Sequence, residues 1–170
     1  YNETYPKNLF ESVNPIYKHK SKIGINKNIN IKTNKDLIFK LFIEIGKSKK
    51  VNLIDTRTKA LLRKNLNLID QEFRKDKYFA KQFQDILKSK HNLSSILKTM
   101  KILGILQKYI PEFGEVVGQM QFDLFHVYTV DEHTFKVVRN MRQMKLYEQE
   151  GFLLEHELIN KLPKIEILYI

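Results

Sequence analysis

The sequence contains no cysteine and no long run of apolar residues. Without cysteine, disulfide bonds and thiolate metal sites are excluded, and a reducing compartment is compatible with the chain. No apolar run approaches the roughly 18 residues that a membrane-spanning helix requires. The first residues, YNETYPKNLF, also lack the apolar stretch of a signal peptide. These absences predict a soluble, cytoplasmic protein with no membrane partner.

Arginine is scarce, although the formal net charge is +11 over 170 residues. Such a charge favours nucleic-acid binding, because clustered cations release counterions from phosphate backbones. However, lysine supplies most of the charge and accompanies abundant asparagine and isoleucine, the bias of an AT-rich genome. Bidentate recognition of phosphates and bases would favour arginine. We therefore expect no nucleic-acid partner, and the alternative of a basic nucleic-acid binder predicts an affinity that falls steeply with salt.

Glycine-rich phosphate loops are also missing. The chain has 6 glycines, and Gly114 and Gly118 do not form a G-x-G-x-x-G turn. We expect these two glycines to serve backbone turns. No cofactor-binding residues are predicted.

The pattern of apolar residues predicts a mainly helical domain with a short N-terminal β-hairpin. Ile23, Ile25, Ile29 and Ile31 alternate around residues 26–28, which predicts two short strands joined by a turn. Helical periodicity follows, and the 42% hydrophobic content is enough for a core. Four helices are expected to begin near Asn34, Asp55, Asp76 and Asn92, the last ending at Gly104.

The helical pattern breaks at residues 109–114, YIPEFG, which predicts a boundary. Thr129 and Glu132 then have the spacing of a capping box, in which each side chain bonds the backbone amide of the other residue. A helix is therefore expected to begin at Thr129. Residues 151–162 predict another helix, and Pro163 can begin a further one. That last pattern stops within an apolar stretch at Ile170, which is typical of a piece of a longer chain.

Residues 118–134, GQMQFDLFHVYTVDEHT, contain the candidate site, because ionisable side chains crowd among apolar ones there. His126 and His133 are seven residues apart, close to two helical turns. Since the capping box separates them, we expect His126 to pack or to support another residue. His133 has two interpretations: a metal ligand, or a first-turn histidine bonded to a backbone or carboxylate group.

The other ionisable residues have simpler interpretations. Asp131 and Glu132 complement the helix dipole in a first turn and need no catalytic role. Asp123 is a candidate partner for a histidine or an arginine, and its role stays open. His19, His91 and His156 are expected to be solvated.

Residues 109–121, YIPEFGEVVGQMQ, continue into FDLFHVYTVDEHTFKVVRNMR, and this long segment resembles the bifunctional uridylyltransferase/uridylyl-removing enzymes. The hairpin and the helices of residues 36–108 fit, more loosely, the helical region that follows the nucleotidyltransferase domain in that family. The resemblance implies two parts. Residues 1–108 would be the uridylyltransferase-associated helical region with its hairpin, and residues 109–170 would be the truncated N-terminal part of an HD phosphohydrolase domain.

The resemblance also implies an activity. Such enzymes transfer UMP from UTP to a tyrosine of the nitrogen-regulatory protein PII, remove it hydrolytically in an HD domain, and respond to glutamine. An HD site holds a divalent metal, here Mg²⁺ or Mn²⁺, with a first histidine, a later adjacent His-Asp pair and a distant aspartate. His133, in EHTFKVV, matches that first histidine. A neutral imidazole suits a transition metal, which lowers the pKa of bound water.

Two motifs of the family do not occur in these 170 residues. The glycine-rich, paired-aspartate motif of the transferase is expected before Tyr1, and the His-Asp pair after Ile170. A single ligand does not make a metal site. We therefore expect no complete catalytic set, and no activity, in this stretch alone. The alternative is a non-catalytic helical interaction module left by truncation or gene decay.

Overall fold

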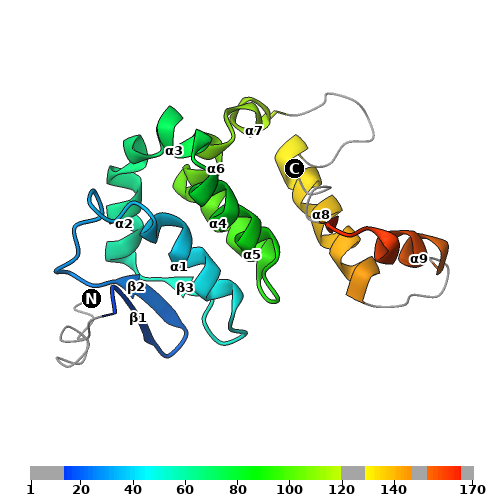
Figure 1. Cartoon of the computed structure of the whole chain (residues 1–170), viewed down its shortest axis with the longest axis horizontal. Helices are drawn as coiled ribbons and strands as arrows, with labels where there is room; N and C mark the ends of the chain where they lie inside the picture. Colours follow the sequence, from blue (N-terminus) through cyan, green and yellow to red (C-terminus); the bar gives the residue numbers. More distant parts are fainter. Residues whose placement is uncertain (1–13, 120–128, 147–152, 166–170) are drawn as a thin grey trace.

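The computed structural model describes residues 14–119, 129–146 and 153–165. Within these ranges a small sheet lies at the N-terminal end and helices form the rest (Figure 1). The strands are β1 (Ile16–His19), β2 (Lys22–Ile25) and β3 (Leu53–Ile54). The helices are α1 (Leu37–Gly46), α2 (Thr56–Lys64), the 3-10 helix η2 (Leu66–Leu68), α3 (Gln71–Lys75), α4 (Lys77–Leu87), α5 (Leu93–Leu103), α6 (Ile105–Tyr109), α7 (Pro111–Val116), α8 (Val130–Leu146) and α9 (Leu153–Lys161). The predicted mainly helical fold with an N-terminal hairpin is confirmed, and the HD-type character of its last helices stays a prediction.

The hairpin exists, but our prediction placed it one strand too late. β1 and β2 pair antiparallel, with Ile16 opposite Ile25, and their turn lies at residues 20–21. At Asn26 the chain leaves the sheet, and the Asn26 side-chain amide donates to the Asn14 carbonyl at 2.7 Å. Ile31 is buried in the turn-rich segment that follows. Of the four alternating isoleucines, Ile23 and Ile25 therefore lie in β2, whereas Ile29 and Ile31 belong to a loop and not to a second strand.

The sheet also has a third strand that the sequence did not predict. β3 pairs parallel to β2, with Ile23 opposite Ile54. A parallel partner requires a long connection, and here the chain returns only after α1. With two residues, β3 is too short to show an alternating pattern.

Aspartate caps explain where several helices begin. The Asp55 carboxylate accepts from the Thr58 amide at 2.9 Å, and Asp76 accepts from the Tyr78 amide at 2.8 Å. These bonds satisfy backbone donors that have no partner inside the helix. The predicted starts of α2 and α4 are thus confirmed. Asp70 caps the short helix α3 in the same way, a helix that the sequence analysis missed.

The two ends of α5 are also as predicted, whereas the start of α1 is not. Asn92 precedes α5, and Gly104 ends it with φ at 81°, a left-handed conformation that glycine adopts without steric cost. α1 follows Asp36 rather than Asn34. The Asn34 side chain instead donates to the Asn30 carbonyl at 2.9 Å, which stabilises the preceding turn.

The core of the helical region is an aromatic cluster, which we define as Phe39, Phe73, Phe83 and Tyr109. Phe39 of α1 is fully buried at its centre. Its ring centroid lies 5.3 Å from that of Phe73, 5.9 Å from that of Phe83 and 4.9 Å from that of Tyr109. The cluster therefore joins α1, α3, α4 and α6 in one apolar core.

The predicted break near Tyr109 is shorter than expected. Only Ile110 separates α6 from α7, and Pro111 occupies the first turn of α7, where its missing amide hydrogen costs nothing. Residues 111–116 are helical rather than irregular. The division of the chain at residues 108 and 109 stays a prediction.

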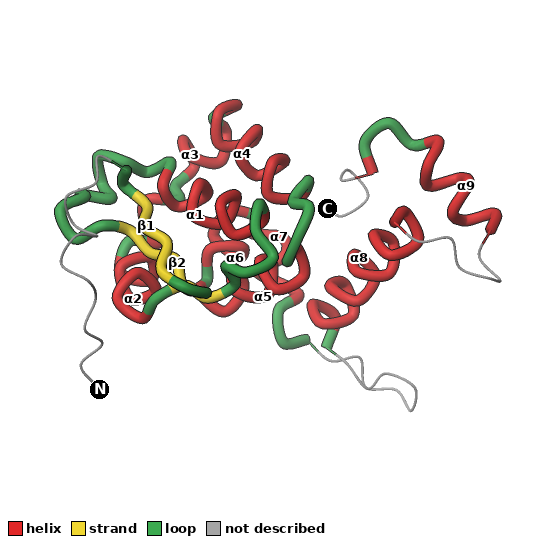
Figure 2. Tube along the Cα trace, turned by 90° about the horizontal axis from the view of Figure 1, so that it is seen from below, coloured by secondary structure: helices red, strands yellow, loops and turns green. Residues whose placement is uncertain are grey.

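The last two described helices lie to one side of the rest (Figure 2). α8 packs against α5 and α7, and α9 packs against α8. The predicted helix of residues 151–162 is thus confirmed as α9, whereas most of the helix expected after Pro163 lies outside the described residues. In the part of the chain that the structure describes, no helix has the length and apolarity needed to cross a membrane.

Candidate metal-ligand helix

His133 lies in the first turn of α8, and its side chain is exposed to solvent. Its backbone amide donates to the Thr129 carbonyl at 2.9 Å, and the Thr134 hydroxyl donates to the Val130 carbonyl at 2.9 Å. The helix therefore begins directly after Thr129, as the sequence predicts. Because the imidazole faces solvent, it is accessible to a metal ion.

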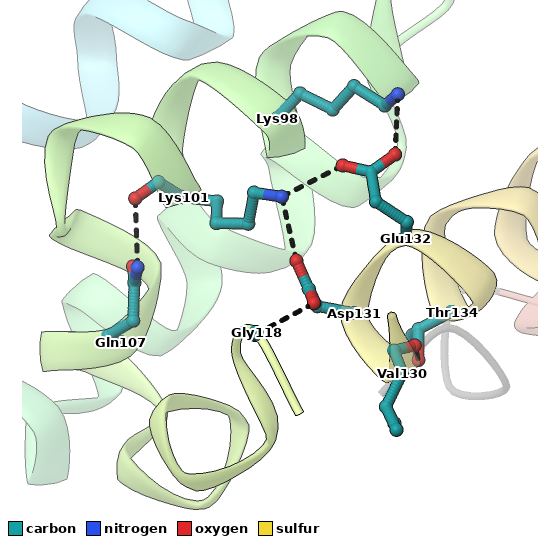
Figure 3. Close-up of polar contacts among 8 residues, drawn as sticks. All are labelled: Lys98, Lys101, Gln107, Gly118, Val130, Asp131, Glu132 and Thr134. Carbon is teal, nitrogen blue, oxygen red and sulfur yellow. Dashed lines mark hydrogen bonds and ion pairs between the residues drawn. The ribbon is translucent and has the colours of Figure 1, made fainter. Parts of the chain in front are cut away.

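Asp131, two residues before His133, is buried, and both of its carboxylate oxygens accept hydrogen bonds. Its side chain is 2% exposed. One carboxylate oxygen accepts from Lys101 Nζ at 2.7 Å, and the other accepts from the Gly118 amide at 3.1 Å (Figure 3). Burial alone would raise the pKa of Asp131, but the hydrogen bonds from Lys101, Gly118 and Thr129 outweigh it and lower that pKa to about 2. The carboxylate is thus ionised at neutral pH.

Lys101 of α5 connects both acids of this turn. Its ammonium lies 2.7 Å from Asp131 Oδ2 and 2.8 Å from Glu132 Oε1. Figure 3 shows how Lys101 reaches both carboxylates from α5. The side chain is 17% exposed, and Nζ lies 5.5 Å from the ring centroid of Phe135. Burial opposes its charge, but the two carboxylates more than compensate and raise the pKa of Lys101. The ammonium is therefore a fixed cation between α5 and α8.

Glu132 does not have the role that we predicted for it. We expected its carboxylate to turn back to the Thr129 amide, but it points to α5, with Oε2 2.9 Å from Lys98 Nζ and Oε1 2.8 Å from Lys101 Nζ (Figure 3). Both lysines lower the pKa of Glu132, Lys101 more than Lys98. Asp131 and Glu132 thus do more than complement the helix dipole, because they join two helices.

An apolar contact completes the packing of α8. Phe135 and Val138 are buried, and the ring centroid of Phe135 lies 5.6 Å from that of Phe113 in α7. A cavity of about 340 Å³ remains beside them, and its walls include Phe83, Leu97 and Ile110. One side of α8 is therefore buried against the rest of the chain, and His133 lies on another side, which is exposed to solvent.

The remaining predicted site residues do not join His133. His126 and Asp123 lie outside the described residues, so their predicted roles stay untested. His19 and His91 are half-buried. His156 is half-buried as well, and its ring contacts the Met144 carbonyl and lies 2.8 Å from the Asn160 side-chain amide, so the expected solvation is only partial.

A complete metal site is not present in the ranges that the structure describes, since no three histidine, aspartate or glutamate side chains converge there. Asp131 and Glu132 are close to His133 in sequence, but their oxygens are bound to lysines and, for one oxygen of Asp131, to the Gly118 amide. One exposed imidazole on an anchored helix fits a single ligand position of a divalent metal, which needs further ligands from elsewhere.

Comparison with known proteins identifies the family. Residues 16–109 match the uridylyltransferase GlnD third domain, a range that ends with α6. Over 134 residues the chain is 42% identical to the bifunctional uridylyltransferase/uridylyl-removing enzyme of Methylococcus capsulatus. It is 39% and 37% identical to the enzymes of that name from Azotobacter vinelandii and Pseudomonas aeruginosa.

These alignments cover 78% of this chain and 15% of each relative, so the chain spans about 15% of the length of the curated relatives it matches. No solved structure matches the chain. The family match covers more than half of the chain, and the identity to several relatives exceeds one third. The chain therefore belongs to the GlnD family of bifunctional uridylyltransferase/uridylyl-removing enzymes.

Proposed function

We propose that this chain is an internal part of an enzyme that transfers UMP from UTP to PII and removes it again. The names of the relatives support both the transfer and the removal of a uridylyl group. The resemblance of residues 109–142 supplies the finer assignment, including PII as the substrate and glutamine as the effector. A cytoplasmic location fits an enzyme that uses UTP and senses an amino acid.

The two parts of the chain have different roles in this proposal. Residues 1–108 form the helical region associated with the transferase, and residues 109–170 begin the HD phosphohydrolase domain. The transferase motif and the His-Asp pair do not occur in these residues. We therefore expect the catalytic groups for transfer, and most of those for removal, in other parts of the complete protein.

The observation that carries the proposal for the second part is the placement of His133. It is exposed in the first turn of α8, while the neighbouring acids are bound to lysines and are not available as ligands. His133 would hold Mg²⁺ or Mn²⁺ together with the later His-Asp pair and the distant aspartate. Such a metal supplies a hydroxide nucleophile by lowering the pKa of bound water. The chain's contribution is to hold one imidazole in a fixed direction.

An assay of both activities tests the proposal. The complete protein that contains this chain would be incubated with PII and UTP, and the mass of PII would be followed by mass spectrometry. We expect PII to gain UMP and to lose it again once UTP is removed and glutamine is added. The separate chain of residues 1–170 should catalyse neither step, because one ligand cannot fix a metal.

Either of two results would contradict this assignment. If the complete protein leaves PII unmodified, the non-catalytic helical module becomes the better interpretation. If residues 1–170 alone release UMP from modified PII, a complete hydrolytic site must lie within them. In both assays, enzyme prepared from a relative such as that of Azotobacter vinelandii serves as the positive control.

A further inference from the structure

The contact between α5 and α8 joins the two parts of the chain. Lys101 lies within residues 16–109, which match the GlnD third domain, whereas Asp131 and Glu132 lie beyond that range. Lys101 is thus a residue of the first part whose ammonium is bound by two carboxylates of the second. No other side chain of the described residues forms ion pairs with both of these acids.

This contact sets the rotation of α8 about its own axis. Lys101 holds Asp131 from one side, and the Gly118 amide holds it from another (Figure 3). Glu132 is bound in turn by Lys101 and Lys98. Three donors thus bind the carboxylates of two adjacent residues, which leaves the first turn of α8 little freedom to rotate.

The rotation of α8 in turn determines where His133 points. Residues two positions apart in an α-helix are separated by about 200° around the axis. The burial follows this geometry, since Asp131 is 2% exposed and His133 faces solvent. Holding Asp131 against α5 therefore directs His133 away from Asp131 and into solvent, where it is accessible to a metal ion.

We infer that Lys101 is a positioning residue for uridylyl removal, which fixes the direction of His133 by binding Asp131 and Glu132. The inference rests on the proposed function, because it needs His133 to be a metal ligand. Lys101 touches neither the metal nor the substrate. Residues that orient a metal ligand in this way typically change metal affinity or activity by about 10- to 100-fold when they are replaced.

The test uses Lys101→Met in the complete protein, which removes the ammonium and keeps most of the side-chain volume. We expect the Mn²⁺ concentration for half-maximal uridylyl removal to rise at least about 10-fold. We expect uridylyl transfer to stay within about twofold, since the catalytic groups for transfer are expected in other parts of the complete protein. Direct binding of MnCl₂, followed by the EPR signal of free Mn²⁺, should show the same loss of affinity.

Two further variants control for charge and for position. Lys101→Arg keeps a cation able to bind both carboxylates and should restore Mn²⁺ affinity to within about threefold of wild type. Lys98→Met removes a lysine that is 49% exposed and whose one ion pair among the described residues is with Glu132, so it should weaken Mn²⁺ affinity much less than Lys101→Met does. Thermal unfolding of each variant reports whether the protein is still folded.

The outcomes separate this inference from the proposed function. If Lys101→Met leaves Mn²⁺ affinity unchanged while His133→Ala weakens it, Lys101 does not position the ligand and the metal assignment stands. If transfer and removal fall together in Lys101→Met and Lys101→Arg alike, the residue supports only the fold, and the inference is wrong. If His133→Ala has no effect on removal, His133 is not a metal ligand, and the assignment of that ligand fails together with this inference.

Discussion

Replacing His133 by alanine in the complete protein is expected to lower uridylyl removal by about 10³-fold and to leave uridylyl transfer within about twofold. Even a residue that only supports a metal ligand contributes about 10- to 100-fold, and the loss of the ligand itself should cost more. Transfer should be preserved because the substitution lies on an exposed position of α8, outside the range that matches the GlnD third domain. Both rates would be measured on the same preparation with PII as the substrate.

The control for this variant is His91→Ala, which removes a half-buried imidazole that precedes α5. It should leave removal and transfer nearly equal to wild type. Removal that continues unchanged in His133→Ala would exclude the histidine as a ligand. A parallel loss of transfer would show instead that the variant damages the fold.

Replacing Phe39 by alanine is expected to lower the free energy of unfolding by about 3–5 kcal/mol, the usual cost of deleting a buried phenylalanine ring. Phe39 is fully buried and contacts the other three rings of the aromatic cluster. Its loss would leave a cavity among α1, α3, α4 and α6, because rings fixed on separate helices cannot all move inward. A typical domain is stable by only about 5–15 kcal/mol, so this loss is large.

Urea titration followed by far-UV circular dichroism measures this effect. The matched control is Ile102→Ala. Ile102 is 65% exposed, so truncating its side chain removes little buried apolar surface. We expect the control to change the free energy of unfolding by less than about 0.5 kcal/mol. Equal effects of the two substitutions would show that the aromatic cluster is not the core of this region.

The parts of the fold that the sequence predicts well depend on local interactions. Asp55 and Asp76 bond amides two or three residues ahead, so their spacing marks the starts of α2 and α4 in the sequence itself. Gly104 ends α5 for an equally local reason, its positive φ. Thr129 marks the start of α8, although the side chain of Glu132 turned out to bond elsewhere.

The parts that it predicts poorly depend on residues far apart in the chain. β3 exists because residues 53–54 return to β2 after α1, and a two-residue strand has no pattern of its own. The misplaced hairpin shows the same limit, since Ile29 and Ile31, which are partly and fully buried in a loop, alternate just as strand residues do. Burial of every second residue produces the same alternation in a strand and in a loop. Only the tertiary contacts determine which of the two forms.

At the candidate site, too, local features could be predicted from the sequence and long-range contacts could not. His133 was singled out by its resemblance to a family motif, but its exposure depends on how α8 packs. Lys101 was missed, because it is one lysine among many in a basic chain and its partners lie about 30 residues away. No local signal distinguishes it from the solvated lysines around it.

Binding of Mn²⁺ to the complete protein, in wild type and in His133→Ala, tests most directly whether His133 is a metal ligand. Equilibrium titration followed by EPR would count the bound ions per chain and give their affinities. We predict two classes of site in wild type, one for transfer and one for removal, and we expect the substitution to weaken only the second class, by at least about 10-fold. Unchanged affinity of both classes in His133→Ala would contradict the assignment.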